Sequence, residues 1–160
     1  MEGKAMNIFI LDRDPVQAAR YTIDKHCSKM VLESAQLLCA AFPVGSAPYR
    51  RTHYNHPCSV WVRESRANFE WLVDHGMGLA DEFILRYGKD HKSEEVIRWC
   101  AKHLDAAGLP DVGLTPFALA MPDQYKRADP VEAYRAYYRG AKAEIATWKA
   151  IRGRPDWWSV

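Results

Sequence analysis

The stretch from residue 14 to residue 41, DPVQAARYTIDKHCSKMVLESAQLLCAA, predicts the fold class of this chain. Asp14 is a typical helix N-cap, and Pro15 suits the first helical turn, where its missing N–H leaves no hydrogen bond unmade. Small or apolar side chains then recur every three or four residues, as on one buried helical face, at Ile23, Cys27, Met30, Ser34 and Leu37. We therefore predict one long helix from Pro15 to Ala41.

Similar helix-start signals, separated by glycine and proline breaks, predict further helices in the rest of the chain. Asn55-His56-Pro57 predicts a second helix from Cys58 to Tyr87, with Gly76 and Gly78 as points where it could bend. Ser93 and the two acids after it predict a third helix that Gly108 ends, and Asp129-Pro130 predicts the start of the last one. Residues 109–126 form a long connection with apolar residues to bury, and loops of that length are often functional.

The predicted architecture is an all-α, compact single domain over residues 1–160, with about four main helices and a long ordered loop before the last helix. Only residues 7–11 resemble a strand, and the tryptophans at 157 and 158 predict a tail that docks on the domain. The 48% hydrophobic and 26% charged composition excludes disordered, collagen-like and coiled-coil chains. Met1 and Met6 are both open as start residues, and we expect residues 1–6 to be flexible.

Charge and cysteine content limit the function classes further. The formal net charge is only +2, so nucleic acid would be held weakly and by a local basic surface. Four cysteines without a CxxC pair favour reduced thiols in a cytoplasmic protein. No apolar run is long enough to span a membrane, and the motifs of P-loop NTPases, α/β-hydrolases and zincin proteases are missing. We therefore expect no membrane partner, no cofactor and no metal.

The first predicted helix carries a polar stripe beside its buried face. His26, Lys29, Glu33 and Gln36 are spaced by three, four and three residues, with Lys25 just upstream. A lysine beside apolar residues can become a nucleophile, and a half-buried glutamate can hold a proton near neutrality. The alternative is a solvated helix face with one weak Lys29–Glu33 pair.

A second polar cluster, residues 49–57, precedes the second helix. It concentrates arginine, histidine and tyrosine next to a helix N-terminus, which favours phosphate recognition. We assign the binding surface to Arg50, Arg51, His53, Asn55, His56 and, further on, Trp61. The alternatives are a loop in which Asn55 or His56 only caps the helix, and a metal held by His53, His56 and His26.

Basic and aromatic residues also interleave on the last helix, where Arg135, Arg139 and Lys142 lie among three tyrosines. This pattern is typical of nucleic-acid binding, but it also fits a buried aromatic stripe beside a solvated face. The second interpretation is the stronger of the two, because most of these aromatics fall on the apolar stripe.

Several motifs resemble those of a family of small, mostly uncharacterised phage-associated proteins. They are Asp24-Lys25-His26-x-x-Lys29-Met30-x-Leu32-Glu33, Thr52-His53-x-Asn55-His56-Pro57 with Trp61, and Met121-Pro122-Asp123-x-Tyr125, together with Asn7 to Asp12 at the start. The resemblance spans nearly the whole chain, but the family supplies no activity.

At the level of fold, the order of parts is similar to the pyrimidine-dimer DNA glycosylases of the endonuclease V type. That resemblance implies a catalytic glutamate on the first helix, which corresponds to Glu33. Those enzymes attack the sugar with a free N-terminal amine, whereas Met1-Glu2 and Met6-Asn7 are not expected to lose methionine. Lys29 or Lys25 would then have to supply the amine, with Glu33 managing the proton and His26 orienting one of them.

The leading hypothesis is an enzyme acting on a base in DNA, either a glycosylase or lyase or an enzyme that processes modified pyrimidines, in repair or modification. The rival is a non-catalytic phage accessory protein that binds a host protein or a small nucleotide through the same stripe. Replacing Glu33 separates the two, because only a catalyst should lose orders of magnitude in rate.

Overall fold

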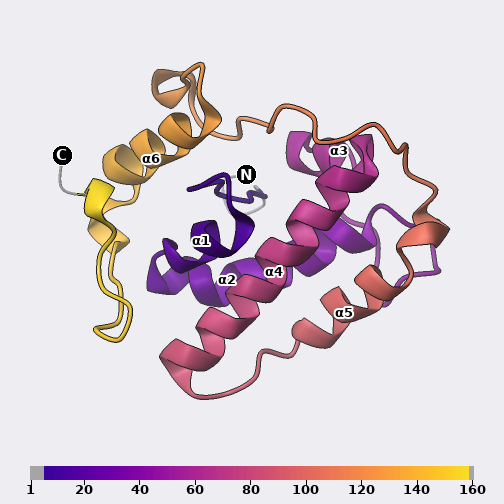
Figure 1. Cartoon of the computed structure of the whole chain (residues 1–160), viewed down its shortest axis with the longest axis horizontal. Helices are drawn as coiled ribbons and strands as arrows, with labels where there is room; N and C mark the ends of the chain where they lie inside the picture. The colour runs from indigo at the N-terminus through magenta and orange to yellow at the C-terminus, as the bar shows by residue number, and fades with distance from the viewer. Residues whose placement is uncertain (1–5, 159–160) are drawn as a thin grey trace.

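The computed structural model describes residues 6–158 of the chain, and within that range every regular element is a helix. The α-helices are α1 (Pro15–Arg20), α2 (Asp24–Cys39), α3 (Pro57–Glu64), α4 (Arg66–Tyr87), α5 (Glu94–Lys102) and α6 (Pro130–Ala141). Buried side chains from all six helices join in one hydrophobic core. The chain is therefore all-α and compact, as predicted (Figure 1). The expectation for residues 1–5 lies outside the described residues, whereas Met6 is buried.

The predicted first helix is divided into α1 and α2, so the prediction of one helix from residue 15 to residue 41 is wrong. Asp14 caps α1 as expected, because its carboxylate accepts the N–H of Val16 at 2.9 Å. The helix then stops at residues 21–23, where the buried Thr22 hydroxyl donates to the carbonyl oxygen of Ala19 at 2.7 Å. Such a local bond competes with continuation of the helix.

The predicted second helix is also divided, at Ser65 rather than at the glycines. Ser65 has an extended backbone, and its hydroxyl caps α4 by accepting the N–H of Asn68 at 3.0 Å. The last helix begins as predicted, with Asp129 as its cap and Pro130 in the first turn. Residue 93 precedes α5, although its side chain makes no capping hydrogen bond there.

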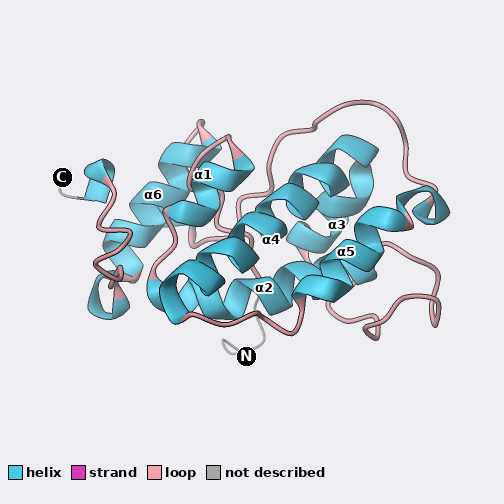
Figure 2. Cartoon of the chain, turned by 60° about the horizontal axis from the view of Figure 1, so that its bottom comes forward, coloured by secondary structure: helices cyan, strands magenta, loops and turns pink. Residues whose placement is uncertain are grey.

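Helix α4 is central, and α1, α2, α3 and α5 all pack against it (Figure 2). Two glycines permit this close approach. A Cβ atom at Gly76 would lie 2.9 Å from Cδ1 of Ile97 on α5, and one at Gly78 would lie 3.1 Å from Cβ of Ala19 on α1. The glycines predicted as bend points are therefore points of close contact between helices, and α4 continues unbroken through them.

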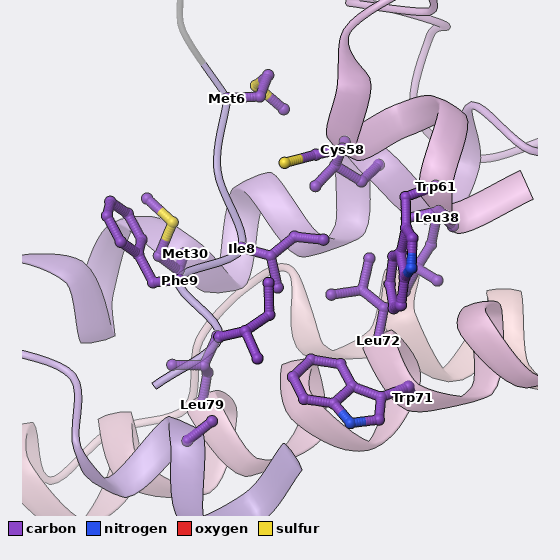
Figure 3. Close-up of a cluster of buried hydrophobic side chains, with 14 of the residues drawn as sticks. Met6, Ile8, Phe9, Met30, Leu38, Cys58, Trp61, Trp71, Leu72 and Leu79 are labelled. Atoms are coloured by element: carbon purple, nitrogen blue, oxygen red, sulfur yellow. The ribbon is translucent and has the colours of Figure 1, made fainter. Parts of the chain in front are cut away.

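Residues 8–11 are buried in the core, but they belong to no regular element and do not form a strand (Figure 3). The side-chain oxygen of Asn7 accepts the N–H groups of both Ile8 and Phe9, at 2.8 and 2.9 Å. Phe9 has a φ of 56°, in the left-handed region that a phenylalanine rarely adopts. With this backbone conformation, the Phe9 ring points away from Ile8 and toward α2, where it stacks on His26 (Figure 3).

The long connection and the tail both lie against the helices, as predicted. The connection runs past α3, where Phe117 packs on Trp61 and Trp71 with ring centroids 5.2 Å apart in each case (Figure 1). At the tail, the Trp148 indole N–H donates to the carbonyl of Tyr21 at 2.9 Å. The Trp157 carbonyl accepts a hydrogen bond from Arg139 on α6 at 3.0 Å. The C-terminal residues 148–158 therefore pack against α6 and against the segment between α1 and α2.

Candidate functional site

Three of the predicted residues, His26, Lys29 and Glu33, line one cavity of about 190 Å³. They lie on successive turns of α2. The opposite walls come from the N-terminal segment, which contributes Met6, Asn7 and Phe9, and from the end of α6, which contributes Tyr137 and Lys142. The cavity therefore joins three parts of the chain that are far apart in sequence, and we call it the α2 pocket.

Glu33 is the acid of the α2 pocket, with a side chain only 8% exposed. One of its carboxylate oxygens accepts the backbone N–H of Asn7 at 3.2 Å, and the other lies 3.5 Å from Nζ of Lys29. Burial raises the pKa of Glu33, and this effect outweighs the charge of Lys29 and the hydrogen bond from Asn7, which both act in the opposite direction. Glu33 is thus suited to hold and release a proton closer to neutrality than an exposed glutamate.

The two lysines predicted on α2 differ in position. Lys29 reaches the pocket from its rim, with a side chain 58% exposed, and forms the ion pair with Glu33. Lys25 is exposed and does not line the pocket. The structure therefore gives Lys25 no place beside Glu33, because it lies about two helical turns before that residue on α2.

His26 is buried and held in a neutral state. Its ring stacks on Phe9, with centroids 4.2 Å apart, and its Nδ1 lies 2.7 Å from the hydroxyl of Tyr138. That hydroxyl also accepts the N–H of Ile23 at 3.2 Å, so it links His26 to the residue that precedes α2. Burial, with the charges of Lys142 and Lys29, lowers the pKa of His26 to about 3. At neutral pH His26 is a fixed wall of the pocket and not a proton carrier.

The sequence prediction missed the residues that face α2 across the pocket. Nζ of Lys142 lies 5.1 Å from the centroid of the Tyr137 ring and 5.9 Å from that of Phe9. Burial, together with the charge of Lys29, lowers the pKa of Lys142. Lys142 belonged to the basic pattern of the last helix, and Asn7 and Phe9 to a conspicuous motif, but nothing in the sequence placed them beside Glu33.

A second, larger depression of about 700 Å³ adjoins the same helix. Its lining contains three cations and no acid, and consists of Leu32, Gln36, Tyr49, Arg50, Arg51, Thr52 and Lys92. Leu32 and Gln36 flank Glu33 in the sequence of α2, so this helix contributes to the walls of both cavities, which share no lining residue. We call this depression the basic groove, and its lining favours an anionic ligand.

The two arginines predicted to bind phosphate, Arg50 and Arg51, both line the basic groove. Arg50 is exposed. Arg51 is half-buried, donates to the carbonyl of Phe42 at 2.7 Å and stacks over the Tyr54 ring at 4.1 Å. Its Nε atom is buried without a hydrogen-bond partner among the described residues, and this side chain is fixed in place.

The other residues predicted for this surface lie elsewhere. His56 caps α3, because its Nδ1 accepts the N–H of Cys58 at 3.0 Å, which is the alternative considered above. Asn55 is exposed on the loop and lines neither cavity, and Trp61 is 2% exposed in the core, where it cannot stack on a ligand. His53 bonds to Thr52 at 2.8 Å and lies close enough that a charge on it lowers the pKa of Glu33 slightly.

The basic and aromatic pattern of α6 is mostly structural. Tyr134 and Tyr138 are fully buried. Arg135 pairs with Asp12 at 3.3 Å, and Arg139 holds the tail. Of this pattern, Tyr137 and Lys142 line the α2 pocket.

Comparison with known protein families, with curated proteins and with solved structures found no match to this chain. Within residues 6–158, no three histidine, cysteine or acidic side chains are grouped so that they could hold a metal ion. No helix in the same range is long and apolar enough to cross a membrane. The functional argument therefore rests on the α2 pocket and the basic groove.

Proposed function

We propose that this protein is an enzyme that acts on a base in DNA, with the base in the α2 pocket and the adjacent phosphates in the basic groove. The observation that carries the proposal is that one helix, α2, lines both sites. A buried acid with amines beside it meets a groove lined by three cations and no acid. A nucleotide drawn out of a strand has this combination of a ring and a charged backbone.

The walls of the α2 pocket suit a planar ring. Tyr137 is half-buried and lines the cavity, whereas the Phe9 ring is 4% exposed, stacks on His26 and forms the back of the pocket. Aromatic side chains of this kind stack on bases that have left the helix. The cavity of about 190 Å³ limits the ligand to about one such ring, so a stacked strand does not fit inside it.

Glu33 supplies the chemistry that base removal or modification requires. Departure of a base needs a proton on the leaving ring, and attack by water or another nucleophile needs a proton acceptor. A carboxyl group whose pKa is raised by burial can serve in both steps at neutral pH. The ammonium of Lys29 adds positive charge, which stabilises negative charge that develops on the departing group.

The test is a panel of oligonucleotides that carry pyrimidine dimers, abasic sites or hydroxymethylated pyrimidines, with base release and mass change as readouts. We expect turnover on one member of the panel and a loss of about two to four orders of magnitude in Glu33→Gln. Glu94→Gln is the matched control, because Glu94 also belongs to an i,i+4 ion pair, with Arg98 at 2.7 Å, but its partner is exposed and it lies outside the α2 pocket.

The rival function is a non-catalytic protein that binds its partner through the same two sites. It predicts no turnover on any member of the panel and tight binding that Glu33→Gln changes little. A wild-type protein that binds oligonucleotides and leaves all of them unaltered would therefore replace the enzymatic proposal with the binding one.

A further inference from the structure

The two lysines of the α2 pocket have different surroundings. Nζ of Lys29 lies 3.5 Å from the Glu33 carboxylate, and the side chain is more than half exposed. Lys142 makes no ion pair with any acid among residues 6–158, and its Nζ lies instead over the rings of Phe9 and Tyr137. Lys29 therefore has an acidic partner in the pocket, whereas Lys142 has none among residues 6–158.

The groups around Lys142 act in the same direction. On α2 it faces the ammonium of Lys29 and the imidazole of His26, which is neutral at pH 7. On its own side it has the Tyr137 ring, and from the N-terminal segment it has Phe9. Glu33 also lines the cavity, but it is paired with Lys29 and hydrogen-bonded to Asn7. Burial and the charge of Lys29 consequently lower the pKa of Lys142.

We propose that Lys142, and not Lys29 or Lys25, is the amine that bonds covalently to the substrate, and that the group it attacks is the C1′ aldehyde of a ring-opened deoxyribose. The inference rests on the proposed function and names the reacting group of the same pocket. Lys29 has a different task in this arrangement, because it holds the Glu33 carboxylate and keeps positive charge near Lys142.

The step balances with Glu33 as the only proton carrier. The lone pair on Nζ of neutral Lys142 forms the C–N bond as the carbonyl π electrons move to oxygen, which takes the Glu33 proton. The nitrogen then returns a proton to Glu33. Finally, Glu33 protonates the hydroxyl, which leaves as water while the nitrogen lone pair forms the C=N bond. The products are a protonated imine, water and a Glu33 carboxylate.

Borohydride tests the step directly, because hydride reduces the imine to a stable amine that links protein and DNA. The probe is an oligonucleotide with a single abasic site, and the variants are Lys142→Arg, Lys29→Arg and, as a control, Lys149→Arg. Arginine keeps the positive charge but cannot form the imine. Lys149 is a suitable control because it also lies over a tyrosine ring, at 4.9 Å from Tyr87, but outside the pocket.

We expect the trapped product to be lost in Lys142→Arg and retained in Lys29→Arg and Lys149→Arg, and peptide mapping of the wild-type adduct should place the link at residue 142. A link at residue 29 or 25, with turnover of the oligonucleotide panel intact, would overturn this inference and leave the proposed function standing. Turnover of the panel without any trapped product would likewise overturn this inference and leave the proposed function standing. No turnover and no trapped product would overturn both.

A second measurement needs no DNA and covers the case in which Lys142→Arg fails to fold. Reductive methylation of the wild-type protein with limiting formaldehyde, mapped residue by residue over a pH series, reports how readily each lysine is deprotonated. Residue 142 should be modified at lower pH than Lys29 and Lys149. Modification of residue 142 only at the pH of the exposed lysines would contradict the inference.

Discussion

Glu33 and Glu82 are both buried glutamates, with 6% and 4% of their surface exposed, but their surroundings differ. Glu82 on α4 accepts hydrogen bonds from two guanidinium groups, Arg86 at 2.9 Å and Arg152 at 2.6 Å. Glu33 on α2 has one backbone N–H at 3.2 Å and a half-exposed lysine at 3.5 Å. Glu33 also lines a cavity, whereas Glu82 lines none of the cavities described here.

This difference in surroundings distinguishes Glu82, which belongs to a structural charge cluster, from Glu33, which belongs to a candidate site. Both carboxylate oxygens of Glu82 accept hydrogen bonds, Oε1 from Arg86 and Arg152 and Oε2 from Arg152. Arg86, with a side chain 0% exposed, also binds Asp24 and the carbonyls of Thr22 and Arg20, so the cluster ties α4, the start of α2 and the tail together. Around Glu33 the pairing is incomplete, and the pKa of the acid is raised. Incomplete pairing next to a cavity is typical of groups that act on a ligand.

The largest effect on stability should come from the complete cluster. Glu82→Gln leaves the buried Arg86 guanidinium with only Asp24 as an acidic partner and releases Arg152 from α4. We expect the free energy of unfolding to fall by about 3 kcal/mol, at the lower end for a broken buried pair because Asp24 remains. Urea unfolding monitored by tryptophan fluorescence measures this. A loss below about 1 kcal/mol would mean that the cluster does not hold the tail.

The basic groove should determine the salt dependence of DNA binding. Replacing both Arg50 and Arg51 with alanine removes two of its three cations. The slope of log K against log salt should then become less steep by about 1.5 to 2. Fluorescence anisotropy at several salt concentrations measures the slope. Arg20→Ala with Arg154→Ala is the matched control, since both arginines line a different cavity near the tail, and an equal change there would exclude a specific role for the groove.

Glu33→Gln should have an effect on stability opposite to that of Glu82→Gln. Because burial raises the folded-state pKa of Glu33 above its usual value of 4.5, the folded protein holds this proton more tightly than the unfolded chain. Wild-type stability therefore falls, relative to the variant, as pH rises through the interval between those two pKa values. Unfolding curves of both proteins at acidic and neutral pH show the difference. A variant that is less stable only at neutral pH would mean that the Lys29 pair dominates.

The smallest effect belongs to Glu94, a half-buried glutamate whose ion-pair partner is exposed. Glu94 pairs with Arg98 at 2.7 Å, closer than Glu33 lies to Lys29, but the Arg98 side chain is 63% exposed. Glu94→Gln should cost no more than about 0.5 kcal/mol, because water competes for an exposed pair. A larger loss in the same unfolding experiment would show that the distance between the paired atoms, and not burial, determines how much each of the three glutamates contributes to stability.

Local signals predicted much of the fold. The Asp-Pro pairs at 14–15 and 129–130 each mark a helix start, because both the cap and the proline act within one turn. The breaks at Thr22 and Ser65 were missed, since hydroxyl side chains interrupt a helix only where tertiary packing favours it. Residues 7–11 suggested a strand, but a single buried segment finds no partner strand among the described residues.

The candidate site could be predicted only in part. The spacing of residues 26, 29 and 33 placed them on one edge of a helix, and they do line one pocket. Lys142 lies more than a hundred residues from Glu33, and the Phe9 ring reaches the pocket only through a left-handed backbone that no propensity favours. Trp61 looked like a binding residue in the sequence, but burial could be judged only from the packing of the connection over α3.

The most direct test of the account is the crystal structure of Glu33→Gln bound to the oligonucleotide that the wild-type enzyme turns over best. The substitution preserves the shape of the pocket and stops the proton transfers. We expect one base, out of the strand, in the α2 pocket against Tyr137, with phosphates at Arg50, Arg51 and Lys92. An oligonucleotide bound with all bases stacked, or held away from the α2 pocket, would contradict the assignment of this pocket as the site of base chemistry.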